Sequence, residues 1–486
     1  MRATVLLGSV TVLSLVVQIV RTKLMALEVG RAGMALVAQF SDYQTLVAGF
    51  LLVGTEQGLI AVAADAYSRG DPNALKSVLK LLRRRIFPFA LAALVVLTAL
   101  TPWILPKVTG QPDYLLPGAL AIGALAAQLL IRPWQAFING AQNFRLLARA
   151  RLAESLFGLA LLLPLALGWH LVGALYSLAL LQIVSLLATL WAWRRLAPPA
   201  ASELATVLEP IESASTTLLR FGVASLAGIA IGNGLSLALR RVIIAKLGLD
   251  QSGLYQVAYG LTQQYLTLVL GAMSAYSFPA FRAVHRDPIK LAQEVNQTLR
   301  GALLIIVPII ATLLVFRQQF IWLLFSKDYL PAGDMLRVQL IGDLFKVIAW
   351  ALGMPILASG RAGLHIALEL LLSCTWLLAI FFGCDFLGTQ GPSWAFLAIY
   401  VFAGGIYLMI TRRVFGFRFT AENLVLVGAS TTCLVLVDLS GDFSLALSAA
   451  AAGVLVAIWA LICVKRSEIL GLRDYVLQRI GRFPQN

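Results

Sequence analysis

The stretch RRVIIAKLGLDQSGLYQVAY, residues 240–259, joins the end of one apolar segment to the start of the next. Two arginines and a lysine interrupt its apolar first half, and a short turn that contains glycine follows. The stretch RTKLMALEVGRAGMALVAQF, residues 21–40, has the same order of basic residues, glycine turn and apolar segment with amide side chains. Similarity between two stretches so far apart indicates an internal repeat of about 215 to 220 residues.

Apolar segments recur along the whole chain of 486 residues, of which 60% are hydrophobic and only 13% are charged. Soluble domains carry about 25% charged residues. About fourteen segments are long enough to cross a hydrocarbon core roughly 30 Å thick, and each is expected to be an α-helix because backbone amides in lipid must be paired internally. These segments are 4–27, 35–66, 86–108, 115–140, 148–168, 171–195, 218–247, 252–281, 300–325, 333–359, 361–386, 391–412, 421–438 and 443–464. The predicted fold class is an all-α polytopic membrane protein.

The distribution of lysine and arginine predicts the orientation of these helices. With the N-terminus on the cytoplasmic side, most of the 38 lysines and arginines fall in cytoplasmic segments, which is the bias that membrane proteins show. Both termini are therefore expected to be cytoplasmic, and the first segment is expected to be a retained helix. The net charge of +15 follows mainly from this topology. Nucleic-acid binding is disfavoured, because the basic residues are scattered over separate loops.

The two repeated stretches align at Gly33 and Gly253, and in this alignment Arg21 falls on Arg241. A second similarity, between DYLLPGALAIG and DYLPAGDMLRVQLIG, lies at nearly the same spacing. Each repeat holds six spans, and two parallel six-helix halves form the ground plan of an alternating-access transporter with its site between the halves. The predicted parts are an N-terminal six-helix half at 1–195, a cytoplasmic linker at 196–217, a C-terminal six-helix half at 218–412, two additional transmembrane helices at 413–465, and a cytoplasmic amphipathic tail at 466–486.

Three features resemble one family of transporters. They are KLMALEVGRAGMALVAQF after the first span, the pair Arg240 and Arg241, and LLFSKDYLPAGDMLRVQLIGDLFKV at the entry to the span at 333–359. These residues are similar to the Wzx-type flippases for O-antigen or enterobacterial common antigen units. This is the lipid-linked oligosaccharide branch of the MOP superfamily (multidrug, oligosaccharidyl-lipid and polysaccharide transporters). The two additional helices depart from that pattern and match the fourteen-helix lipid II flippases of the same superfamily, which leaves the cargo open.

The resemblance implies a MOP flippase fold and a function in lipopolysaccharide biosynthesis. The cargo would be an undecaprenyl-diphosphate-linked oligosaccharide, moved by alternating access from the cytoplasmic to the periplasmic leaflet of the bacterial inner membrane. It implies that the chain is not an enzyme and needs no cofactor, with H⁺ or Na⁺ as the coupling ion. Besides the bilayer and the glycan, the polysaccharide polymerase and chain-length machinery are the partners it suggests.

Two other functions are alternatives to this one. A multidrug extruder of the same superfamily would share the architecture, but organic cations favour a carboxylate-lined cavity. A membrane-embedded polysaccharide polymerase or ligase is the alternative among enzymes. Such enzymes typically present a large periplasmic loop, whereas the predicted outside loops here are short.

Basic residues inside the apolar segments are the candidate groups for binding cargo in a cationic cavity. A diphosphate that leaves water needs cationic donors, and arginine can bind phosphate through two hydrogen bonds. Arg132 is expected to be the counterpart of Lys346 in the other half. Snorkelling to the interface is the alternative for the arginines near span ends, and pairing with Asp343 is the alternative for Lys346. The candidates are Arg21, Lys23, Arg132, Arg240, Arg241 and Lys346.

Carboxylates inside the apolar segments are the candidate groups for ion coupling, because burial favours the protonated form and lets protonation depend on the side that the site faces. Each has the alternative of pairing with a nearby base. The candidates are Asp42, Glu56, Asp343 and Glu369. The four cysteines lack CxxC spacing and the three histidines are isolated, so neither a disulfide framework nor a metal site is expected.

Overall fold

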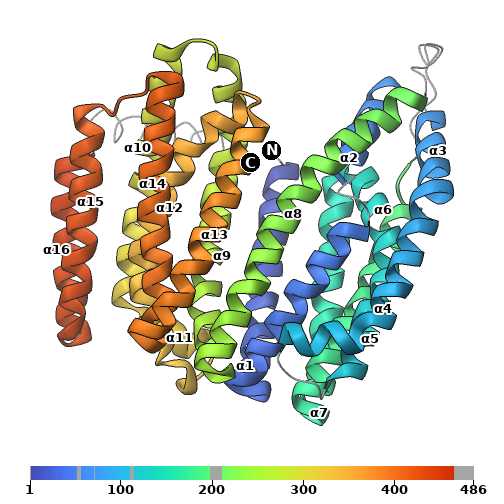
Figure 1. Cartoon of the computed structure of the whole chain (residues 1–486), viewed down its shortest axis with the longest axis horizontal. Coiled ribbons are helices and arrows are strands. Elements are labelled where there is room, and N and C mark those ends of the chain that lie inside the picture. Colours follow the sequence, from blue (N-terminus) through green and yellow to red (C-terminus); the bar gives the residue numbers. More distant parts are fainter. Residues whose placement is uncertain (1, 52–55, 71, 110–113, 198–210, 465–486) are drawn as a thin grey trace, which may run out of the picture. The chain divides into compact units, whose positions relative to one another are not determined.

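A computed structural model of the chain describes residues 2–51, 56–70, 72–109, 114–197 and 211–464. Every regular element in these ranges is helical (Figure 1), which confirms the predicted all-α fold. The predicted cytoplasmic tail lies outside the described residues, and so does most of the predicted linker. Helix α8 begins at Ile211, inside the segment predicted as linker.

The chain divides into two compact units, each described by itself. The first unit holds the residues up to Gln256 and the short segment Leu323–Tyr329. Between α3 and α4 it has one π-helical turn, Leu82–Ile86, and between α5 and α6 a short 3-10 turn. Its helices are α1 (Arg2–Leu51), α2 (Glu56–Arg69), α3 (Pro72–Leu81), α4 (Phe87–Thr109), α5 (Leu115–Gly123), α6 (Gln128–Gly140), α7 (Phe144–Arg194) and α8 (Ile211–Leu247).

The second unit holds Val257–Trp322 and the residues from Leu330 onward. Helix α9 begins at Leu249, so its first turns belong to the first unit. The helices of the second unit are α9 (Leu249–Val284), α10 (Pro288–Val315), α11 (Arg317–Leu324), α12 (Ala332–Ala358), α13 (Ala362–Leu387), α14 (Gly391–Phe415), α15 (Ala421–Leu439) and α16 (Leu445–Cys463). The division falls after α8, whereas the sequence prediction placed it in the linker; the functional boundaries of the halves stay a prediction.

Two very long helices are each broken once. Helix α1 is interrupted at Gly30 (φ 65°, ψ −173°), and α7 is interrupted at His170 (φ 45°, ψ −121°). Each break falls between two predicted spans. Within the described residues, nine helical stretches are long and apolar enough to cross a membrane, and one of them is the whole of α7 with two predicted spans. The chain is therefore a multi-pass membrane protein.

The same backbone features recur at a constant spacing of 218 residues. The pairs with positive φ are Gly30 and Gly248, Gln142 and Gly360, and His170 and Gly388. His170 and Gly388 also share the second dihedral, with ψ values of −121° and −129°. Matching positive-φ positions at one spacing indicate that the two segments follow one helical plan. At this spacing Arg241 corresponds to Lys23 rather than to Arg21. The earlier alignment at Gly33 and Gly253 differs by two residues, because the second copy has two extra residues just after Gly248.

The last two helices are fixed to the second unit through a buried asparagine pair. Asn423 on α15 donates from Nδ2 to the backbone oxygen of Asn296 on α10 at 2.9 Å and to its Oδ1 at 2.8 Å. Trp459 on α16 donates from Nε1 to Ser430 on α15 at 3.0 Å. Helices α15 and α16 pack on each other and on α10 (Figure 1). Buried polar contacts thus hold this pair in place where lipid offers no hydrogen bonds.

Replacing Asn423 with alanine tests this attachment. The change leaves Asn296 Oδ1 with one donor fewer, so we expect the free energy of unfolding in detergent to fall by about 0.5–2 kcal/mol. Chemical denaturation of the purified protein measures it. The control is Thr431→Ala on the same helix, where the hydroxyl only bonds back to Val427 at 2.9 Å. Equal stability of the two variants would contradict the attachment.

Candidate functional site

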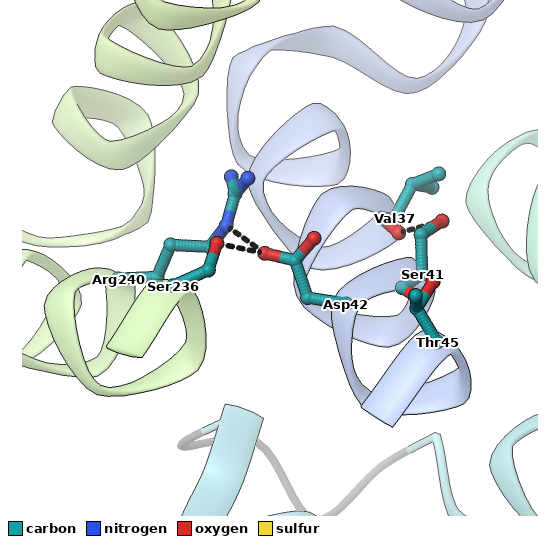
Figure 2. Close-up of polar contacts among 6 residues, drawn as sticks. All are labelled: Val37, Ser41, Asp42, Thr45, Ser236 and Arg240. Carbon is teal, nitrogen blue, oxygen red and sulfur yellow. Dashed lines mark hydrogen bonds and ion pairs between the residues drawn. The ribbon is translucent and has the colours of Figure 1, made fainter. Parts of the chain in front are cut away.

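A buried ion pair joins α1 to α8 (Figure 2). Nε of Arg240 lies 2.7 Å from Oδ2 of Asp42, and the hydroxyl of Ser236 donates to the same oxygen at 2.6 Å. The side chain of Arg240 is only 6% exposed and that of Asp42 is 24% exposed. Arg240 therefore does not snorkel to the interface, and its charge is balanced inside the unit.

The pair unites one predicted cargo-binding residue with one predicted coupling carboxylate. Ser236 and Arg240 lie one helical turn apart on α8, so both side chains reach the same face of α1. Among the described residues, Nη1 of Arg240 is buried without a hydrogen-bond partner. An unpaired guanidinium nitrogen beside a partly exposed carboxylate leaves capacity for a further acceptor.

A second group of charges gathers around Glu154 on α7, which interacts electrostatically with Arg21 on α1, with Arg132 on α6 and with Arg151. The side chains of Arg21, Arg132 and Glu154 are half-buried. Three bases around one acid leave an excess of positive charge in this group. Sequence analysis missed Glu154, although it is the one acidic residue in the apolar segment 148–168.

Arg132 is one turn away from the position that corresponds to Lys346. At the spacing of 218, the counterpart of Lys346 is Gln128, whose Nε2 donates to Gln182 on α7. Arg132 donates from Nε to Oε1 of Gln128 at 3.0 Å. Arg132 therefore lies four residues from the position that corresponds to Lys346, and no basic residue stands at that position in the first copy.

Lys346 on α12 lies against two aromatic rings of α14. Its Nζ is 5.6 Å from the ring centre of Phe396 and 5.2 Å from that of Tyr400. Asp343, one turn earlier, accepts a hydrogen bond of 2.6 Å from the hydroxyl of Tyr265 on α9. The alternative of a direct pair between Asp343 and Lys346 is not observed: their charges interact through space, but no ion pair joins them in the described part of the chain.

The other candidates have separate positions. Lys23 donates from Nζ to the backbone oxygen of Leu323 at 2.8 Å, near the end of α11. Arg241 is half-buried on α8. Glu369 on α13 accepts a hydrogen bond of 3.0 Å from Tyr407 on α14, and the side chain of Glu56 lies outside the described residues.

The six basic candidates are divided between the two units. Five of them belong to the first unit, namely Arg21, Lys23, Arg132, Arg240 and Arg241, and Lys346 belongs to the second. A single cavity that all six line stays a prediction. Within the described residues, no group of three or more histidine, cysteine or acidic side chains is arranged to hold a metal ion.

Comparison with known proteins gives this arrangement a family context. A family model described as "Polysaccharide biosynthesis protein" matches residues 86–334. The chain is 25% identical over 410 residues to the lipid III flippase of Escherichia coli, covering 80% of this chain and 94% of that protein, and it matches the lipid III flippase of Shigella flexneri to the same extent.

Two solved structures share the fold. The lipid II flippase MurJ in an inward closed conformation has a TM-score of 0.67 and 14% identity, over 94% of this chain and 98% of that chain. An inward-facing multidrug resistance MATE family transporter of the MOP superfamily has a TM-score of 0.64 and 16% identity, over 83% of this chain and 94% of that one. The fold is therefore that of the MOP superfamily.

Removing the acidic partner of the ion pair between Asp42 and Arg240 tests how much this pair contributes to the free energy of unfolding. Asp42→Ala leaves Arg240 charged and uncompensated, so we expect the free energy of unfolding in detergent to fall by about 3 kcal/mol. The matched control is Asp65→Ala, which breaks an exposed pair with Arg69 at 2.9 Å and should cost less than about 0.5 kcal/mol. Similar losses in both variants would show that burial of the pair has no energetic consequence.

Proposed function

Because the chain belongs to the polysaccharide biosynthesis protein family and has the MOP fold, we propose that it is a lipid-linked glycan flippase. The proposed cargo is an undecaprenyl-diphosphate-linked oligosaccharide, moved from the cytoplasmic to the periplasmic leaflet of the inner membrane with both termini cytoplasmic. The 25% identity to lipid III flippase, over nearly all of that protein, supports a cargo of this class. O-antigen units are the proposed finer identity.

The observation that carries the proposal is that Lys346, in a helix apolar enough to span a membrane, forms no ion pair with any residue that the structure describes. An uncompensated ammonium at the bilayer centre costs at least about 2.5–3.5 kcal/mol. Aromatic rings offset only part of that cost, and a fully buried aspartate one turn away is engaged by Tyr265 instead. A protein that only needed stability would close the pair or replace both residues with apolar ones. Binding of an anionic cargo accounts for a lysine that is kept without an ion pair.

The first unit supports the same chemistry. Arg21, Arg132 and Arg151 all interact electrostatically with Glu154, and one nitrogen of the buried Arg240 has no hydrogen-bond partner among the described residues. Diphosphate oxygens accept several charge-assisted hydrogen bonds, and guanidinium groups suit them best. The undecaprenyl tail is proposed to stay in lipid while the head group crosses.

Transport by alternating access is proposed to draw on an ion gradient. The proposed coupling carboxylates are Asp42, Asp343 and Glu369. Glu56, whose side chain lies outside the described residues, is proposed as a fourth. Each of the first three accepts a hydrogen bond from a neighbouring helix, so a change in protonation would alter a contact between helices. Purified protein in liposomes that moves cargo independently of pH and of sodium would reject coupling.

A multidrug function is less well supported, although the fold is shared with a multidrug transporter. Organic cations favour a carboxylate-lined cavity, whereas three arginines interact with Glu154 in the first unit. For the polymerase or ligase alternative, neither the family match nor the relatives named above offer support.

Charge reversal tests the proposed function. In a strain that lacks its own flippase and depends on this protein, Lys346→Glu combined with Arg241→Glu is expected to lower surface glycan about tenfold or more, because an anion would then face like charge. Glycan blots measure export, and immunoblots of membranes must show normal protein levels.

Arg69→Glu is the matched control, because Arg69 lies exposed on α2, where it forms an exposed ion pair with Asp65. It should leave export within about twofold of the unmodified protein. Full export by the double variant at normal protein level would remove the proposed function.

A further inference from the structure

Tyr265 donates a hydrogen bond to a buried aspartate that lies one turn from Lys346. Asp343 and Lys346 lie three residues apart on α12, a spacing at which side chains of opposite charge normally pair. The hydroxyl of Tyr265 on α9 lies 2.6 Å from Oδ2 of Asp343. Lys346 is turned instead to the rings of Phe396 and Tyr400, with its Nζ 5.6 Å and 5.2 Å from their centres.

The burial of these groups makes the open arrangement informative. Asp343 is completely buried, and its Oδ1 has no hydrogen-bond partner among the described residues. In a medium of low polarity a carboxylate attracts an ammonium more strongly than it does in water. The unpartnered oxygen of Asp343 would therefore draw Lys346, one turn away, into an ion pair. The pair stays open only if the carboxylate is held in another direction.

The fold does not require this trio. In the first copy, Leu125 corresponds to Asp343 and Gln128 to Lys346, both at the spacing of 218 residues. Thr45 corresponds to Tyr265 at a spacing of 220 residues, which applies after the turn at Gly30 and Gly248. None of the three can form the same contacts. The same helical plan is thus built without the tyrosine, the aspartate and the lysine, which points to a role for them in transport rather than in folding.

We propose that Tyr265 is a positioning residue that keeps Asp343 off Lys346, so that the ammonium stays available to phosphate oxygens of the cargo. This inference rests on the proposed flippase function and deepens it. Aromatic rings hold an ammonium more weakly than a buried carboxylate does. Lys346 can therefore leave Phe396 and Tyr400 for an arriving anion, whereas a closed pair with Asp343 would have to be broken first.

Binding of undecaprenyl diphosphate to the purified, detergent-solubilised protein tests the inference. Tyr265→Phe removes only the hydroxyl, so Asp343 is free to close onto Lys346, and affinity should fall about fivefold or more. Adding Asp343→Asn to this variant removes the competing charge and should restore affinity to within about twofold of the unmodified protein. Rescue by the second substitution separates positioning from a general structural defect.

Tyr329→Phe is the matched control, because it also removes a buried tyrosine hydroxyl, one that donates to the backbone oxygen of Ala26 at 3.2 Å rather than to a carboxylate. It should leave affinity within about twofold of the unmodified protein. Unchanged binding in Tyr265→Phe, or a loss that Asp343→Asn does not rescue, would overturn the inference. Absence of binding by the unmodified protein would instead reject the proposed cargo, and the inference with it.

The Asp343→Asn variant alone keeps the inference testable if Tyr265→Phe does not yield folded protein. In the binding step the carboxylate competes with the cargo for Lys346, and its proposed part in ion coupling concerns transport, which this assay does not measure. Its loss should therefore leave undecaprenyl diphosphate binding as tight as in the unmodified protein, or tighter. A tenfold loss of affinity in folded Asp343→Asn protein would show that the carboxylate assists binding, and would contradict the proposed role of Tyr265.

Discussion

A positive charge inside a membrane helix must be compensated where it stands, because the surrounding lipid offers neither water nor counterions. This chain carries several such charges and compensates them in three different ways. Arg240 has a buried ion pair with Asp42, Arg21 and Arg132 share Glu154, and Lys346 lies on aromatic rings. In the described part of the chain the first case is an ion pair, the second is a group in which three arginines act on one glutamate, and in the third the lysine forms no ion pair.

Incomplete compensation is what an anion carrier needs. A fully neutralised arginine would have to break its ion pair before it could bind phosphate, and a fully exposed one would be too costly to keep in lipid. Residues that set how far each charge is compensated matter as much as the bases themselves. Glu154 compensates the arginines around it, and Tyr265 engages the aspartate that could pair with Lys346. The two units reach this state differently, although they follow one helical plan with matched breaks at His170 and Gly388.

Hydropathy and periodicity predicted the helices well, because the length and apolarity of a membrane span are local properties of the chain. The repeat was visible for the same reason, in the basic residues and glycine before and after each turn. Its register was wrong by two residues around Arg21, since only the backbone at Gly30 and Gly248 shows where the insertion lies. The start of α8 at Ile211 was missed because its first turns are polar.

Partners of the charged residues could not be predicted, because they come from helices far apart in the sequence. Nothing local joins Asp42 to Arg240, or Tyr265 to Asp343. Glu154 was missed although a lone acid in an apolar segment is itself informative. For Lys346, the local spacing rule offered a pair with Asp343 as the alternative to cargo binding, whereas in the structure Asp343 accepts a hydrogen bond from Tyr265.

The most direct measurement is transbilayer movement by purified protein in liposomes, with two cargoes that differ only in charge. One is an oligosaccharide linked to undecaprenol through diphosphate, and the other is the same oligosaccharide linked without phosphate. If cationic groups that are only partly compensated receive the head group, the diphosphate form should cross and the neutral form should stay behind. Equal movement of both forms, or movement of neither, would contradict this account.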